Sequence, residues 1–170
     1  VNLVQRIDRF TGGLTLSAQS RTAFNHSADC VPFVTLNGKC LDRNLEPMFD
    51  IVRELVTRYD FSDHRRLKNL LLEYRAAHES NVVSNGHRLA ISLAARHFSA
   101  ARYLSEIWSG LHQLRMLKEI TADLTAAQLT IQAEKLQRIG QTLFTGDNLK
   151  SALIGEENSV KQAVAPLESI

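Results

Sequence analysis

The chain of 170 residues has only two cysteines, Cys30 and Cys40, and they lie on either side of a predicted strand. Ten residues of extended chain at ~3.3 Å each hold their Cα atoms roughly 30 Å apart. A disulfide needs Cα atoms within about 7 Å of each other, so the two thiols are expected to be free. Free thiols favour an intracellular protein of the cytoplasm or of an organelle matrix.

Charge of one sign and aromatic side chains are also scarce. Lys and Arg number 20 against 18 Asp and Glu, which gives a net charge of +2. This balance argues against a phosphate backbone or an anionic membrane as partner. Aromatic residues make up 6% and do not alternate with basic ones, which argues against single-stranded nucleic acid. No apolar run approaches the ~20 residues of a membrane-spanning helix.

The signatures of the common hydrolases are missing. His78-Glu79 begins like the zinc motif H-E-x-x-H, but Val82 stands where the second His belongs. Neither H-x-x-E-H nor G-x-S-x-G occurs, and Gly12-Gly13 lacks the Lys of a phosphate loop. Cys40 has no local signature of a nucleophile. We therefore predict no catalytic, cofactor-binding or metal-binding residue in this chain.

Two histidines also fail as a metal pair. His87 and His97 lie roughly 80° apart around a helix and nearly three turns apart along it, so they cannot share a metal without a third element. His87 is predicted on the solvent face. His78 falls on the apolar face and is predicted to be packed there.

Helical spacing is what the sequence does have. Val1, Val4, Ile7 and Phe10 predict a first helix that stops at Thr11-Gly12-Gly13. Because no capping residue and no initiator Met precede Val1, we expect the chain to begin inside an element of a longer protein.

A small sheet is predicted beside the helices. Leu14–Ala18 alternates apolar and polar residues, and Pro32–Leu36 is a second strand that pairs with it in antiparallel fashion. A third candidate strand is Leu149–Ile154. The loop between the first two strands holds Asn25-His26-Ser27, a glycosylation triplet that arises easily by chance.

Later helices follow from apolar stripes and caps. The first is capped by Asn44 and has Met48, Ile51, Val52, Leu55 and Tyr59 on its buried side. The next is a single long helix that opens near Ser62, with Gly86 as its weakest point and with a stripe of Leu67, Leu70, Leu71, Tyr74, His78, Val82, Leu89 and Leu93. Others are a helix from Ser99 through Leu114, one from a Thr125/Gln128 capping box to Leu143, and a short one around Val160–Val164 that ends near Pro166. The prediction is an α+β fold, predominantly helical with a small antiparallel sheet of two to three strands, in one domain over residues 1–170.

The densest basic cluster is Arg65, Arg66 and Lys68, near the start of the long helix. Positive charge is mildly unfavourable at a helix N-terminus. We therefore treat these three residues as candidates for contact with a substrate or another domain, against the alternative of a solvated face.

A succession of short blocks carries a family resemblance. The blocks are Asp8–Leu14, Leu36–Asn44, Met48–Asp50, Asp60–Asp63, Arg66–Lys68, Ser84–His87, Leu104–Glu106 and Gly110–Leu111. In this order the sequence resembles the presequence-protease branch of the pitrilysin/insulinase metallopeptidases. The match covers essentially the whole chain, although no single block is decisive.

The resemblance implies a function that the residues alone do not. Members of this family close two halves around a chamber for unfolded peptides, with zinc and H-x-x-E-H in the first half. This sequence resembles the start of the second half, an incomplete third domain, so no catalytic ligand of the family maps onto it. It implies a segment that is inactive alone, with the catalytic half of the same polypeptide and peptide substrates as partners and zinc in the parent enzyme only.

Two other interpretations stay open. A stand-alone helical interaction module would bind a partner through an apolar groove. An autonomous hydrolase would lose activity on Cys40→Ala or His78→Ala. A truncated sheet would also expose an edge strand, so the isolated chain is expected to be able to dimerise.

Overall fold

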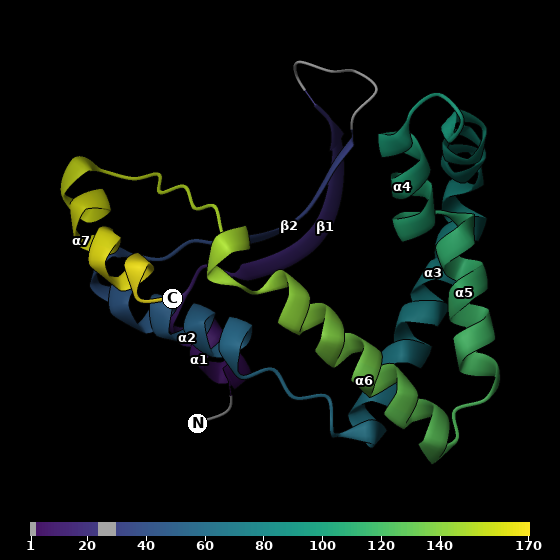
Figure 1. Cartoon of the computed structure of the whole chain (residues 1–170), viewed down its shortest axis with the longest axis horizontal. Coiled ribbons are helices and arrows are strands. Elements are labelled where there is room, and N and C mark those ends of the chain that lie inside the picture. Colours follow the sequence, from purple (N-terminus) through teal and green to yellow (C-terminus); the bar gives the residue numbers. More distant parts are fainter. Residues whose placement is uncertain (1–2, 24–29) are drawn as a thin grey trace. The chain divides into compact units, whose positions relative to one another are not determined.

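A computed structural model describes residues 3–23 and 30–170. These residues are 69% helical and include one two-stranded antiparallel sheet, so the predicted α+β class is confirmed (Figure 1). The chain forms two compact units. The first unit comprises Val1–Leu16, Leu36–Phe61 and Glu134–Ile170, and the second comprises Ser17–Thr35 and Ser62–Ala133.

The N-terminal part follows the sequence prediction closely. Helix α1, Leu3–Phe10, is the predicted first helix, although Val1 lies outside the described residues. Gly13 has a φ of 116°, a left-handed conformation that favours glycine, and it turns the chain into the sheet. Strands β1, Leu14–Thr22, and β2, Cys30–Gly38, are longer than the two predicted strands. The triplet Asn25-His26-Ser27 lies outside the described residues.

The core of the first unit lies between α2, Leu45–Thr57, and α7, Glu157–Glu168, which pack together. Ile51 of α2 is fully buried, as its stripe predicts. Phe49, outside that stripe, is also buried, at 4% exposure. Arg6 of α1 forms an ion pair with Glu54 of α2.

The second unit is built from three helices that pack on one another. They are α3, His64–Ala95, α4, Ala100–Ser109, and α5, Leu111–Ala122. Glu79 of α3 accepts from Arg75 and pairs with Lys118 of α5, and these two cations lower the pKa of the Glu79 carboxyl. Arg75 also donates to Thr121 of α5 at 3.1 Å, so polar contacts tie α3 to α5.

Helix α6, Ala126–Leu143, begins in the second unit and continues into the first. The amide of Gln128 donates to Oγ1 of Thr125 at 3.4 Å, as the predicted capping box requires. In the first unit, the ring of Tyr59 packs 5.8 Å from that of Phe144. A Cβ on Gly140 would overlap the Tyr59 ring, so this glycine is where α6 meets the aromatic side chain closely.

The long-helix prediction is confirmed, with a local change. Helix α3 runs through Gly86, but Asn85 has non-helical angles (φ −128°, ψ 28°), one residue before the predicted weak point. Two members of the predicted stripe, Leu70 and Tyr74, are each 48% exposed, so their predicted burial is wrong. Within the second unit, the packing helices cover a narrower strip of α3 than the apolar pattern suggested.

Two further predictions are wrong. Residues Leu149–Ile154 form no strand; the 3-10 turn η2, Gly146–Asn148, leads instead into irregular chain in which Ile154 is fully exposed. The helix expected from Ser99 through Leu114 ends at Ser109 and restarts at Leu111, because Gly110 adopts an extended conformation (φ −99°, ψ −157°).

Candidate functional site

The predicted contact residues lie at the start of α3. The carboxylate of Asp63 caps the helix by accepting from the amide of Arg66 at 2.9 Å. Arg65 and Arg66 are exposed and line a cavity of about 280 Å³. Its other lining residues are Asp63, Asn69, Leu70 and Glu73. The cavity therefore mixes two guanidinium groups with two carboxylates rather than presenting one charge.

Lys68 is exposed but is not among the residues that line this cavity. At about 100° per residue, the cavity residues from Arg65 to Glu73 fall within an arc of roughly 140° on the helix. Lys68 lies outside that arc. The structure thus brings Arg65 and Arg66 together on one face and separates Lys68 from them.

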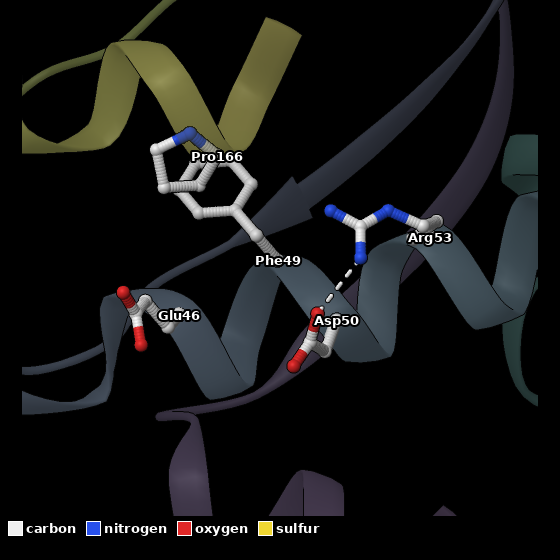
Figure 2. A pocket seen from close by; sticks show the side chains of 5 residues that line it. All are labelled: Glu46, Phe49, Asp50, Arg53 and Pro166. Atoms are coloured by element: carbon white, nitrogen blue, oxygen red, sulfur yellow. Dashed lines mark hydrogen bonds and ion pairs between the residues drawn. The ribbon is translucent and has the colours of Figure 1, made fainter. Parts of the chain in front are cut away.

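A second cavity, of about 240 Å³, lies in the first unit between α2 and α7 (Figure 2). Phe49 and Pro166 line it together with Glu46, Asp50 and Arg53. Nη1 of Arg53 donates to Oδ1 of Asp50 at 2.9 Å, and its Nε donates to the carbonyl of Ser169 at 3.1 Å. No sequence pattern signalled this cavity, because Phe49 and Pro166 belong to distant segments.

The most enclosed charged group is Glu106 of α4, whose exposure is 0%. Its Oε2 accepts from Oγ of Ser92 at 2.6 Å, and its Oε1 accepts from the amide of Leu111 at 2.9 Å. Nδ1 of His112 lies 3.3 Å from the same Oε1. Glu106 thus joins α3, α4 and the first turn of α5.

Two effects act on this carboxyl in opposite directions. Desolvation by burial raises the pKa of Glu106, while hydrogen bonds from Ser92, His112 and Leu111 lower it, and the net shift is downward. The carboxylate therefore stays ionised and caps α5, which has no Ser, Thr, Asp or Asn at its start. Sequence reasoning missed this role. A glycine followed by an uncapped helix was the available signal.

The histidines and cysteines do not converge. Among the residues that the structure describes, no group of three or more His, Cys, Asp or Glu side chains is placed to hold a metal ion. His78 is half-buried and packs edge-on against Tyr74, with ring centroids 4.7 Å apart. His87 is exposed, as predicted.

Both thiols are free, as predicted. Burial, together with the nearby Asp42 carboxylate, raises the pKa of the Cys40 thiol. A thiol of raised pKa is largely protonated at neutral pH and is a poor nucleophile. The geometry of Cys40 therefore gives no support to a catalytic role.

What these residues offer is surface for binding. Each cavity is lined by exposed charges and at least one apolar side chain. None of the helices in the described ranges is both long enough and apolar enough to cross a membrane.

Comparison with known proteins identifies the family. The family of regions associated with peptidases of family M16, subfamily C, matches residues 1–120. The chain belongs to this peptidase-associated family. The family resemblance seen in the short sequence blocks is thereby confirmed.

Curated relatives extend the match to most of the chain. A protein named mitochondrial presequence protease from Danio rerio is 31% identical over 164 residues, which is 96% of this chain and 16% of that protein. Proteins of the same name from Yarrowia lipolytica and Mus musculus are 27% and 26% identical, over 89% and 97% of this chain. The chain spans about 16% of the length of these relatives.

Proposed function

We propose that this chain is a non-catalytic segment of a zinc-dependent metallopeptidase that degrades unfolded peptides, in which it forms part of the chamber wall. The observation that carries the proposal is the match to presequence proteases along nearly the whole chain. Membership of the peptidase-associated family supports the same assignment.

Zinc belongs to another part of the proposed enzyme. The described side chains of this segment offer no cluster that fits a zinc ion, so no step of zinc chemistry is placed on them. We propose that the catalytic half of the same polypeptide binds the zinc. Because the relatives are named mitochondrial, we also propose an organelle matrix as the location.

The proposed contribution of this segment is to hold the substrate. A wall that encloses an extended peptide keeps it oriented toward the reacting groups, which lowers the entropic part of the barrier. Closure around the peptide also excludes water and folded proteins. Arg65, Arg66 and Lys68 are the proposed contacts with peptide or with the opposite half, because all three are exposed.

The proposal is tested on the longer polypeptide that contains these residues. Reversing Arg65 and Arg66 to Glu is expected to raise KM for a peptide substrate roughly tenfold, because two contacts change from attraction to repulsion. The matched control is Arg115→Glu, which reverses a guanidinium on α5 that is 83% exposed. Unchanged kinetics in the double variant would remove the basic cluster from the proposal.

Two further measurements test the assignment itself. Zinc chelation should abolish peptide cleavage by the longer polypeptide, and the 170-residue chain alone should show no turnover. An H-x-x-E-H helix encoded several hundred residues upstream would support the proposal. Turnover by the isolated chain, or a reading frame confined to these residues, would favour the autonomous hydrolase or the stand-alone interaction module. A dimer of the isolated chain would be compatible with an exposed sheet edge and would not distinguish these cases.

A further inference from the structure

The end of α3 and the start of α4 carry positive charge without nearby exposed carboxylates. Between Glu79 and Glu106 the sequence contains three arginines and two histidines and no acidic residue. Arg96 donates from Nε to Nε2 of His97 at 3.0 Å, and its Nη1 lies 3.2 Å from Nε2 of His112. The Glu106 carboxylate is fully buried and already accepts three hydrogen bonds, so it is not available to a partner.

The elements that pack against this corner do not add an exposed acid within the described residues. Oγ of Ser20 on β1 donates to the carbonyl of Ala101 at 2.9 Å, which brings the hairpin beside α4. Arg21 follows Ser20 and lies 6.0 Å from the ring centroid of Phe33. Asp29, in the same hairpin, lies outside the described residues. On α5, His112 faces the corner through its contact with Arg96.

Aromatic side chains lie among these cations. Phe98, in the turn between α3 and α4, is 85% exposed, and Tyr103 on the first turns of α4 is 51% exposed. A large aromatic side chain left in water forgoes the stabilisation that burial would give it, so a partner that covers it gains that stabilisation on binding. Exposed aromatics next to arginines are the composition of binding hot spots.

We propose that this surface, the α3–α4 corner of Arg96, Phe98, Arg102 and Tyr103, binds peptide substrates that carry carboxylates on either side of an apolar side chain. Arg96 and Arg102 pair with the carboxylates, and Phe98 and Tyr103 cover the apolar side chain. The inference rests on the proposed function in taking a peptide as the substrate. Charge complementarity selects the acidic class, because the corner offers no exposed carboxylate to a basic peptide.

A peptide fits the corner better than a nucleic acid does. Nucleic-acid binding depends on neutralising a regular row of phosphates, and its strength scales with the number of cations in that row. Here the cations are few and are interrupted by the aromatic side chains, while the whole chain carries a net charge of only +2. Carboxylates that flank an apolar side chain match this spacing of charge and aromatic surface.

The test measures binding to the 170-residue chain by fluorescence anisotropy. The probe is a labelled Glu-Glu-Leu-Phe-Glu-Glu peptide, and its charge-reversed counterpart is Lys-Lys-Leu-Phe-Lys-Lys. We expect the acidic peptide to bind and the basic one not to bind. The affinity should fall as salt is raised from about 0.05 to 0.5 M, because exposed charges are screened.

Two variants locate the binding site, and each has a matched control. Arg102→Glu is expected to weaken the acidic peptide roughly tenfold, whereas Arg115→Glu, the same charge change on α5, should leave its affinity unchanged. Phe98→Ala is expected to weaken it roughly fivefold, whereas Val83→Ala, at a side chain that is 90% exposed, should not. Arg102, Phe98 and Val83 are all exposed, so circular dichroism should show that the variants fold like the parent chain.

Other outcomes would overturn the inference. These are no binding of the acidic peptide, equal binding of the basic peptide, equal effects of Arg102→Glu and Arg115→Glu, or preferred binding of a single-stranded DNA oligonucleotide. Peptide cleavage by the longer polypeptide without binding at the corner would overturn the inference and leave the proposed function standing. Binding at the corner in a longer polypeptide that cleaves no peptide would overturn the proposed function.

Discussion

At the scale of a residue, Glu106 is the side chain on which the second unit depends most. A buried carboxylate is costly unless its oxygens receive hydrogen bonds. Here Ser92 and Leu111 supply them from two other helices at 2.6 and 2.9 Å. Because these bonds favour the ionised form more than burial disfavours it, the pKa of Glu106 lies below its ordinary value.

Glu106→Gln is therefore expected to change how stability depends on pH. The unfolded chain titrates this carboxyl near its ordinary pKa of 4.5, while the folded chain titrates it lower, so the unfolded state binds more protons in between. The stabilisation is fully present above pH ~4.5 and is lost as pH falls through the lower folded pKa. At pH 7 the substitution should reduce the free energy of unfolding by about 1–3 kcal/mol.

Urea denaturation from pH 7 down to pH 3 checks this expectation. The difference between the parent chain and Glu106→Gln should shrink as the pH falls. The control Glu119→Gln, on a side chain of α5 that is 66% exposed, should change stability at pH 7 by less than about 0.5 kcal/mol. A difference at Glu106 that stays constant, or grows, toward low pH would contradict the argument.

The sequence could place single residues only where chemistry and periodicity agree. Ile51 follows the apolar stripe of its helix and is fully buried. Glu106 could not be predicted in the same way, because a Glu on a helix is ordinarily exposed and its partners here come from two other helices. Arg65 and Arg66 could be singled out as a basic cluster, but that Lys68 lies apart from them depends on which arc of the helix borders the cavity.

At the scale of an element, the break between α4 and α5 is made by Gly110. Its extended backbone conformation is one that other residues also adopt. What requires glycine is space, since a Cβ at this position would overlap the Glu106 carboxylate. The helix break and the buried charge are therefore one feature.

Gly110→Ala and Gly86→Ala should consequently have opposite effects. At Gly110 the added methyl group displaces the capping carboxylate, so we expect the free energy of unfolding to fall by about 1–3 kcal/mol. At Gly86, inside α3, a Cβ meets nothing within 4 Å, so alanine should raise it by about 0.5–1 kcal/mol. Urea denaturation followed by circular dichroism measures both. Changes of the same sign would refute the steric explanation.

Periodicity predicted the elements well and their interruptions poorly. The stripe through α3 keeps its phase across Gly86, so a single long helix was predicted correctly. The stripe from Leu104 to Leu114 also keeps its phase, but there the chain breaks at Gly110 because the Glu106 carboxylate occupies the space. Asn44, a residue type that favours caps, makes no side-chain cap hydrogen bond because it closes the 3-10 turn η1, Asp42–Asn44.

At the scale of the whole molecule, the order of blocks along the sequence was enough to predict the family. The peptidase-associated family matches residues 1–120, which include every block of the resemblance. The function of the surfaces could not be predicted equally well. Exposed arginines and apolar side chains show that a surface can bind, and only its partner decides what it binds.

The prediction of a single domain over residues 1–170 concerns how the two compact units unfold. Three elements, β1, β2 and α6, each contain residues of both units. A helix forms cooperatively, so unfolding one unit would cut α6 within its length and lose hydrogen bonds on both sides of the cut. We therefore expect the two units to unfold together.

Ile51→Ala tests this expectation, because Ile51 is fully buried in the first unit and the chain's single tryptophan, Trp108, lies in the second. The cavity should lower the free energy of unfolding by about 2–4 kcal/mol. If the units unfold together, the urea midpoint read from Trp108 fluorescence shifts as far as that read from circular dichroism. Val4→Ala, at a side chain of the first unit that is 53% exposed, should shift neither midpoint appreciably. An unmoved Trp108 midpoint with a biphasic dichroism curve would mean that α6 can be divided at little cost, and the chain would then contain two folding domains.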